Sequence, residues 1–226
     1  MAALVSITVG TVDISLLDGL AELTGGSINS QTHTILIDIR LPRILLAIAV
    51  GAVLASTGAV MQGQFRNPLA DPSLIGVSSG ASVGASLMIV TAGGFIKSGA
   101  LLGLSLVAVG AFVGGFAATL LVYRLATSGI GTSVTTMLLA GIAIGALAGA
   151  LNSLLSYFSD NDMLRQISLW QMGNLSGASW TKVIVMGAVA LLLMGLFPRE
   201  SKALNALLLG ESEARHLGLA VQRVKR

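Results

Sequence analysis

The sequence predicts an all-α, polytopic membrane protein. Of its 226 residues, 54% are hydrophobic and 10% are charged, whereas soluble domains carry about 25% charged residues. The mean hydropathy is +0.88. A transmembrane helix needs roughly 20 mostly apolar residues, and several stretches of the chain meet that requirement. We therefore expect one transmembrane domain over residues 1–226, with no separate soluble domain.

Charge and cysteine content exclude several classes of protein. A net charge of +3 would suit nucleic-acid binding, but the basic residues flank the apolar stretches, as is typical of membrane proteins. The absence of cysteine excludes disulfides and thiolate metal sites. His33 and His216 lie in different segments, so we expect neither a metal site nor a cofactor. Because P-loop, Gly-x-Ser-x-Gly and His-Glu-x-x-His motifs are all missing, we expect no ATP site or catalytic site in this chain.

Five spans are predicted, and two shorter pieces precede them. Residues 1–9 are apolar but too short to span, and read as the end of a helix that begins further upstream. Residues 15–23 are predicted to form an amphipathic helix capped by Ser15, which can lie at the membrane interface. The first span should begin at Pro42, whose missing N–H needs no partner there, and Pro198 should end the fifth. The predicted spans are residues 43–62, 73–92, 100–123, 134–158 (capped by Thr132 or Ser133) and 179–197.

Two of the connecting segments carry polar side chains. In the loop after the first span, Asn67 and Asp71 each precede a proline, which disfavours helix. The loop is therefore either a rigid turn or a fixed corner beside a partner or gate, with Arg66, Asn67 and Asp71 pairing or capping the next helix. Asp160 and Asp162 could form an acid–base pair, but a solvated loop near Arg165 is favoured.

The charges also predict the orientation. Residues 199–226 hold the densest basic cluster, so they should be cytoplasmic. Residues 202–209 and 211–217 are expected to form two short helices there, separated by Gly210. Counting back over five spans places Arg66 and Arg124 inside, and Lys97, Arg165 and residues 1–42 outside. Arg40 and Arg43 then lie outside against the usual bias, either snorkelling or forming a cationic docking patch for an acidic partner.

Small residues recur every four positions in the spans. These stripes are Gly76, Gly80 and Gly84; Gly110 and Gly114; and Gly141, Gly145 and Gly149. Small residues let helix backbones approach closely in lipid, so helix packing is the favoured interpretation. The stripe of the fourth span continues into Asn152 and Ser156. Polar groups in a membrane must face protein or water, so the alternative is that this face lines a pathway.

Several motifs, in order along essentially the whole chain, resemble the FecCD family, the permease subunits of ABC importers for iron-siderophores, haem and cobalamin. The motifs are Arg40-Leu41-Pro42-Arg43, Arg66-Asn67-Pro68-Leu69-Ala70-Asp71-Pro72 with Leu74-Ile75-Gly76, Ser79-Gly80-Ala81, Leu139-Ala140-Gly141, and Leu208-Leu209-Gly210-Glu211 with Ala214, Leu217 and Gly218.

The resemblance implies a type II ABC importer permease fold in the bacterial inner membrane, with ten transmembrane helices per subunit. It also implies a permease homodimer, two copies of an ATPase subunit and a periplasmic substrate-binding protein. The chain would then correspond to the end of family helix 1 through helix 6, and we expect it to be a fragment or a truncated product.

The resemblance also implies roles for individual residues. Arg40 and Arg43 match the arginines that dock the binding protein. Ser133, Val134, Thr135 and Thr136 match the cytoplasmic gate region, in a span that lines the pathway with Asn152 and Ser156. Residues 199–226 correspond to the cytoplasmic coupling-helix segment of the family. Within it, the residues that match the helices contacting the ATPase are Gly210, Glu211, Ala214, Leu217 and Gly218.

The favoured hypothesis is a non-catalytic permease subunit that imports an iron chelate, haem or an iron-siderophore, with cobalamin as the alternative. An ATP-independent secondary transporter is the competing class. Such transporters often place charged groups or broken helices at the membrane midplane. No Asp, Glu, Lys or Arg lies at the centre of a predicted span, which favours the permease.

Overall fold

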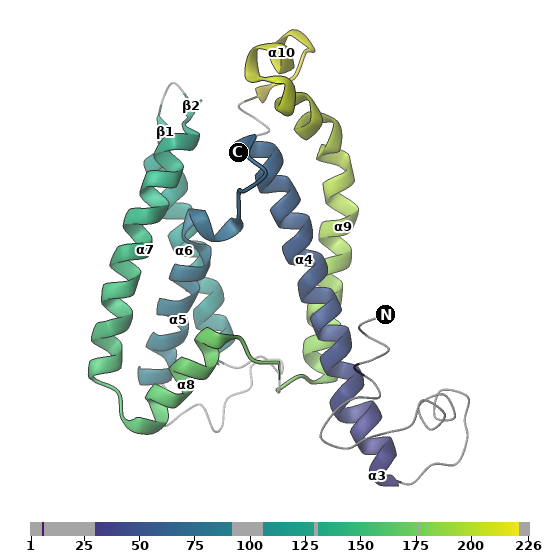
Figure 1. Cartoon of the computed structure of the whole chain (residues 1–226), viewed down its shortest axis with the longest axis vertical. Coiled ribbons are helices and arrows are strands. Elements are labelled where there is room, and N and C mark those ends of the chain that lie inside the picture. The colour runs from purple at the N-terminus through teal and green to yellow at the C-terminus, as the bar shows by residue number, and fades with distance from the viewer. Residues whose placement is uncertain (1–5, 7–29, 92–105, 129–130, 176, 222–226) are drawn as a thin grey trace. The chain divides into compact units, whose positions relative to one another are not determined.

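The computed structural model describes residues 6, 30–91, 106–128, 131–175 and 177–221 (Figure 1). The two short pieces expected near the N-terminus, apart from Ser6, and residues 92 and 100–105 of the expected spans lie outside this part. Four described helices are long and apolar enough to cross a membrane: Gln31–Phe65, Leu106–Ala126, Val134–Tyr157 and Trp180–Leu209. Val77–Thr91 is a shorter apolar helix of 15 residues. The prediction of an all-α membrane protein is confirmed.

The chain divides into two compact units. The first comprises Met1–Leu54 and Asn174–Met194, and the second comprises Ala55–Gly173 and Gly195–Arg226. Two long helices, α4 (Leu41–Phe65) and α9 (Trp180–Leu209), contribute to both units. The first unit also contains α3 (Ser30–His33) and the π-helix η1 (Thr34–Arg40).

Pro42 does not begin the first span, contrary to the prediction. The helical run passes through it from η1 into α4, and the Leu41 N–H donates to the Leu36 carbonyl, five residues back. Proline lacks an N–H, and its ring clashes with the carbonyl four residues earlier in an α-helix. The wider π turn directly ahead of Pro42 changes that local geometry, so the helix continues.

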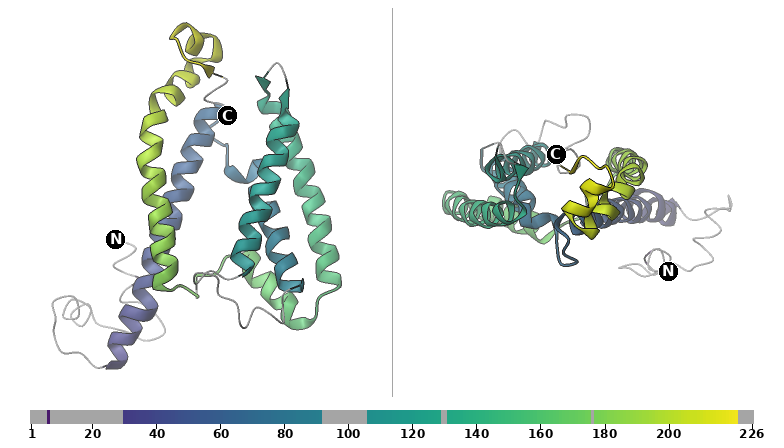
Figure 2. Two further views of the ribbon diagram at one scale, coloured as in Figure 1. Left: turned by 180° about the vertical axis from the view of Figure 1, so that it is seen from behind. Right: turned by 90° about the horizontal axis from the view of Figure 1, so that it is seen from above.

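The second unit contains a bundle in which α5 (Val77–Thr91) packs against α6 (Leu106–Ala126), and α7 (Val134–Tyr157) contacts both (Figures 1 and 2). The strands β1 (Thr127–Ser128) and β2 (Gly131–Thr132) form an antiparallel hairpin between α6 and α7. A short 3₁₀ helix, η2 (Pro72–Ile75), leads into α5 through the left-handed Gly76. The second span therefore begins at Val77, four residues later than predicted.

Glycines bring α5 and α6 together. A Cβ at Gly80 would collide with the Ala118 side chain and the Gly114 carbonyl, and one at Gly84 would collide with the Gly110 carbonyl. The packing interpretation of these stripes is thus confirmed. Towards the β1–β2 end, Val122, Ala126 and Met137 form a small buried cluster between α6 and α7.

The segment with Asp160 and Asp162 is a helix, α8 (Asn161–Met172), and not the predicted solvated loop. The Asp160 carboxylate caps it by accepting a hydrogen bond of 2.8 Å from the Met163 N–H. Asp162 lies in its first turn, where negative charge is stabilised by the helix dipole. Ile167 is buried while most of the other α8 residues are exposed, so α8 is amphipathic, and it contacts α5 and α7.

Pro198 does not end the fifth span, which is a second wrong prediction. The helix α9 continues through it to Leu209, so residues 202–209 belong to α9 and are not a separate helix. A proline inside a helix leaves the carbonyl four residues earlier without its N–H donor, and membrane helices tolerate such prolines. One turn after the proline, the Ser201 hydroxyl donates to the Pro198 carbonyl at 2.7 Å, which is a separate local bond. The predicted break at Gly210 is confirmed, and α10 (Glu211–His216) follows.

Candidate functional site

The first candidate group is the basic pair in the first unit. Arg40 is the last residue of η1 and Arg43 lies in the first turn of α4. Arg43 is exposed and Arg40 is half-buried, whereas Pro42 between them is almost fully buried. Positions three apart share one side of a helix. The buried Pro42 therefore anchors a turn that presents two guanidinium groups on one side.

The second group lies at the N-terminus of α7. Ser133 is the N-cap, which confirms one of the two predicted caps, and its hydroxyl oxygen accepts from the Thr136 N–H at 3.3 Å. The Thr136 hydroxyl donates to the same oxygen at 3.0 Å. Thr135 and Thr136 are exposed, and the Ser133 N–H donates to the Ala126 carbonyl at 2.9 Å. The start of α7 is thus tied to the end of α6.

Asn152 lies near the opposite end of α7, about 24 Å from Thr136 along the helix axis. Its amide nitrogen donates to the Ser82 hydroxyl of α5 at 3.0 Å. The Asn152 amide oxygen is buried and has no hydrogen-bond partner within the described part of the chain. Half-buried Ser156 lies one turn further along α7. The structure therefore separates the predicted gate residues from Asn152 and Ser156.

The stripe that leads to Asn152 faces η2 at Gly141 and α5 at Gly145. A Cβ on Gly141 would collide with the Leu74 carbonyl, and one on Gly145 would lie 3.5 Å from the Ser79 hydroxyl. A Cβ on Gly149 would meet nothing within 4 Å. This face packs closely at Gly141 and opens further along the helix. Sequence reasoning missed Ser82, although it lies three residues after Ser79 on α5, a spacing that predicts a shared helix face.

The third group is the segment at the end of α9. Ala206, Leu207, Ala214 and Val221 form a buried cluster that holds α10 against the last turns of α9. The Gly218 N–H donates to the Arg215 carbonyl and the Leu219 N–H to the Ala214 carbonyl. With φ of 82° at Gly218, these two bonds form a Schellman C-cap. Three leucines are exposed beside the polar side chains of α10: Leu208, Leu209 and Leu217 are 56%, 68% and 64% exposed.

Glycine is required at the α9–α10 junction. Gly210 has φ of 126°, which other residues rarely adopt, and a Cβ there would collide with the Glu213 carboxylate. A hydrogen bond of 2.6 Å from the Ser212 hydroxyl is the main reason why the pKa of Glu213 lies below its usual value. The positive charge of Arg66, in the loop after α4, lowers that pKa further. Sequence reasoning missed this link between the two segments.

The loop after α4 is held by hydrogen bonds within its own turns, and the predicted capping by Asp71 is confirmed. The Asp71 carboxylate accepts from the Ser73 N–H at 2.8 Å, which caps η2, and the Ser73 hydrogen bonds lower the Asp71 pKa. The Asn67 side chain accepts from the Leu69 N–H at 2.9 Å. Each side chain therefore serves its own turn, and Leu69 between them is 84% exposed.

Comparison with known proteins finds one matching family model and several similar permeases. A family model described as "FecCD transport family" matches residues 1–226. The chain is 42% identical over 225 residues to the hemin transport system permease protein HmuU of Yersinia pestis. It is 37% identical over 257 residues to the cobalamin import system permease protein BtuC of Halobacterium salinarum. These alignments cover 98% and 97% of the chain but 66% of each relative.

A solved structure described as an inward-facing conformation of a metal-chelate type ABC transporter is also similar. It matches with a TM-score of 0.80 and 32% sequence identity, over 99% of this chain and 66% of the other. The chain thus spans about two thirds of the length of these relatives.

Proposed function

Since the chain belongs to the FecCD transport family, we propose that it forms the membrane-spanning part of a permease subunit in an ATP-driven importer. The observation that carries the proposal is the family match over residues 1–226 together with four helices able to cross a membrane. The proposed location is the bacterial inner membrane. In this proposal the chain performs no chemistry, and a separate ATPase subunit hydrolyses ATP.

The proposed substrate is an iron chelate, haem or an iron-siderophore. Support comes from the 42% identity to a hemin permease over nearly the whole chain and from the metal-chelate description of the similar structure. Cobalamin is the second candidate, because two cobalamin or vitamin B12 permeases are 37% and 42% identical, the latter over 181 residues.

The proposed ATPase contact is the segment Gly210, Glu211, Ala214, Leu217 and Gly218, which we place on the cytoplasmic side. Exposed leucines on an aqueous segment are characteristic of a protein–protein contact, and the buried cluster beneath them makes that surface rigid. Two copies of the permease and two ATPases would form the assembly. Arg40 and Arg43 are proposed to dock acidic residues of a periplasmic binding protein, since opposite charges steer association.

The proposed mechanism is alternating access. ATP and the loaded binding protein must favour different states of the gate, because a ligand shifts an equilibrium only by its differential affinity. Ser133, Val134, Thr135 and Thr136 are the proposed gate at one end of α7. Asn152 and Ser156 are proposed pathway residues, and the unpartnered oxygen of Asn152 offers an acceptor to a substrate group or a water.

Reconstituted transport tests this function. The complete permease is placed in proteoliposomes with its ATPase and binding protein, and uptake of haem, an iron-siderophore and cobalamin is measured with and without ATP. We expect ATP-dependent uptake of an iron chelate. Uptake that is independent of ATP would instead indicate a secondary transporter. Uptake of cobalamin alone would contradict the proposal that the substrate is an iron chelate.

A further inference from the structure

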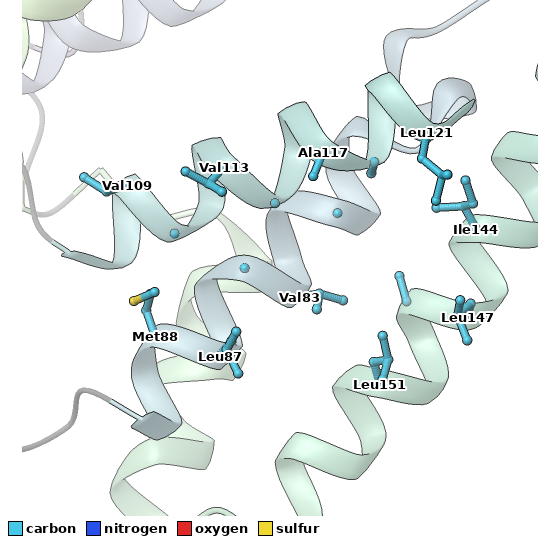
Figure 3. Close-up of a pocket in the computed structure, with 16 residues that line it drawn as sticks. Val83, Leu87, Met88, Val109, Val113, Ala117, Leu121, Ile144, Leu147 and Leu151 are labelled. Carbon is cyan, nitrogen blue, oxygen red and sulfur yellow. The ribbon is translucent and has the colours of Figure 1, made fainter. Parts of the chain in front are cut away.

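An apolar groove runs between α5, α6 and α7 in the second unit (Figure 3). Its volume is about 400 Å³. The residues that line it are aliphatic side chains, one methionine and small residues, and they include Leu87, Val109, Val113, Leu121, Leu147 and Leu151. Gly84, Gly110 and Gly114 lie where α5 and α6 touch. The groove therefore offers hydrocarbon contacts and no lining side chain that forms hydrogen bonds.

The groove has the length of one leaflet. From Leu121 to Val109 it extends about 18 Å along α6, and half of a 30 Å hydrocarbon core is about 15 Å. Its rim is open, with Val113 58% and Leu147 60% exposed. Since α6 and α7 are candidate membrane spans, such a rim would lie at the depth of the hydrocarbon core.

A cation continues the groove at one end. Arg124 lies three residues after Leu121 and seven after Ala117, spacings that place it on the groove face of α6. It is exposed, and it makes no hydrogen bond or ion pair with any residue the structure describes. The predicted orientation puts this end of α6 on the cytoplasmic side, where the leaflet carries negative charge.

We propose that the groove binds one acyl chain of an anionic phospholipid of the cytoplasmic leaflet, and that Arg124 pairs with the phosphate of that lipid. Guanidinium matches phosphate oxygens in charge and in geometry. The apolar lining matches the acyl chain, and the groove runs from headgroup level towards the bilayer centre. The orientation of the lipid rests on the proposed function, but the lipid contact itself requires no transport.

A neighbouring helix is the other occupant to consider. A helix with its side chains is 10–12 Å across, so a single turn occupies roughly 400–600 Å³. A helix along the whole groove would need about three turns and would stay largely outside it. The groove volume instead falls within the 300–1,000 Å³ of small-molecule sites.

Native mass spectrometry of the purified complete permease in detergent tests the proposal. Phosphatidylglycerol and phosphatidylcholine with identical acyl chains are titrated separately. We expect phosphatidylglycerol to bind about fivefold more tightly, the factor that corresponds to about 1 kcal/mol per basic side chain. Arg124→Gln should remove that preference, whereas Arg165→Gln on α8 should retain it. Equal binding of the two lipids, or an Arg124→Gln variant that keeps the preference, would overturn the proposal.

A second pair of variants tests the groove itself. Ala117→Trp places a large side chain in the groove and should abolish binding of the first lipid. Ala146→Trp lies on the opposite side of α7, at an exposed position, and should bind lipid normally. Loss in both variants or in neither would reject the groove as the site.

These 226 residues contain no cysteine, so Leu147→Cys, in a complete permease from which any other cysteine has been removed, also reports on a second copy. An efficient disulfide between two copies in membranes would assign the groove to a protein interface and overturn the lipid site. Lipid binding is read without transport, so its failure and a failure of ATP-dependent uptake are distinguished.

Discussion

Arg66 ends α4 in a conformation that few residues other than glycine adopt. Its φ is 51°, its N–H donates to the Gly63 carbonyl, and the Asn67 N–H donates to the Gln62 carbonyl. These are the two bonds of a Schellman cap, in which glycine is preferred at the position Arg66 occupies. The charge of Arg66 acts on Glu213 of α10. A strained backbone is thus kept at a residue that links two segments of the second unit.

Two substitutions of Arg66 separate the effect of its left-handed backbone conformation from the effect of its positive charge. Arg66→Ala and Arg66→Gly both remove the guanidinium, but only glycine adopts a left-handed conformation without steric cost. We expect Arg66→Gly to be more stable than Arg66→Ala by about 1 kcal/mol, measured as the midpoint of thermal unfolding in detergent. Equal stability of the two variants would mean that the left-handed turn is not retained.

At the scale of single elements, α7 carries three glycines with the same spacing but different surroundings. Gly141 touches the Leu74 carbonyl, whereas Gly149 has open space where a Cβ would lie. The sequence stripe identified a face of the helix, and the position of η2 beside Gly141 determined where that face makes its close contact. Helix packing therefore needs a small residue at one end of the stripe only.

Alanine at each of these positions tests that difference. We expect Gly141→Ala to destabilise the protein by about 1–3 kcal/mol, because a rigid carbonyl blocks the added methyl group. Gly149→Ala should be neutral or stabilising by up to about 1 kcal/mol, since alanine is the better helix former. The unfolding midpoints of both variants provide the measurement, and a reversed order would show that α7 packs differently.

At the scale of the whole molecule, Arg40 and Arg43 are proposed to contact the binding protein, and the segment around α10 is proposed to contact the ATPase. Arg40→Glu with Arg43→Glu should abolish capture of the binding protein, because it reverses both charges, and should leave ATPase association intact. Leu217→Asp should do the opposite, because it places a charge on the exposed apolar surface beside α10.

Pull-down assays with the two partners measure both effects, and variants that melt like the unsubstituted protein give the valid comparison. If both variants lose the same partner, the assignment of the two groups is wrong.

Local sequence patterns predicted most of the helices and several of their caps, because the free energy of forming these features depends mainly on neighbouring residues. Apolar runs of about 20 residues predict membrane helices whatever their neighbours are, and α4, α6, α7 and α9 all contain such a run. Gly210 was predicted as a break, and Ser133 and Asp71 were among the predicted alternatives for caps, because caps and left-handed turns depend on a few adjacent residues. The motifs from Arg40 to Gly218 indicated the family before any contact was known.

Tertiary structure decided what depends on surroundings. Pro42 and Pro198 both lie inside helices, the first directly after a π turn and the second within the long helix α9. The helix after Asp160 has a local cap, but the burial of Ile167 depends on the fold. Ser82 became the partner of Asn152 only when α5 and α7 met. Likewise, Leu121 and Leu147 line one groove only because α5, α6 and α7 pack together, and this groove ends near Arg124. Contacts between distant segments depend on helix tilt and rotation, and no local pattern encodes these.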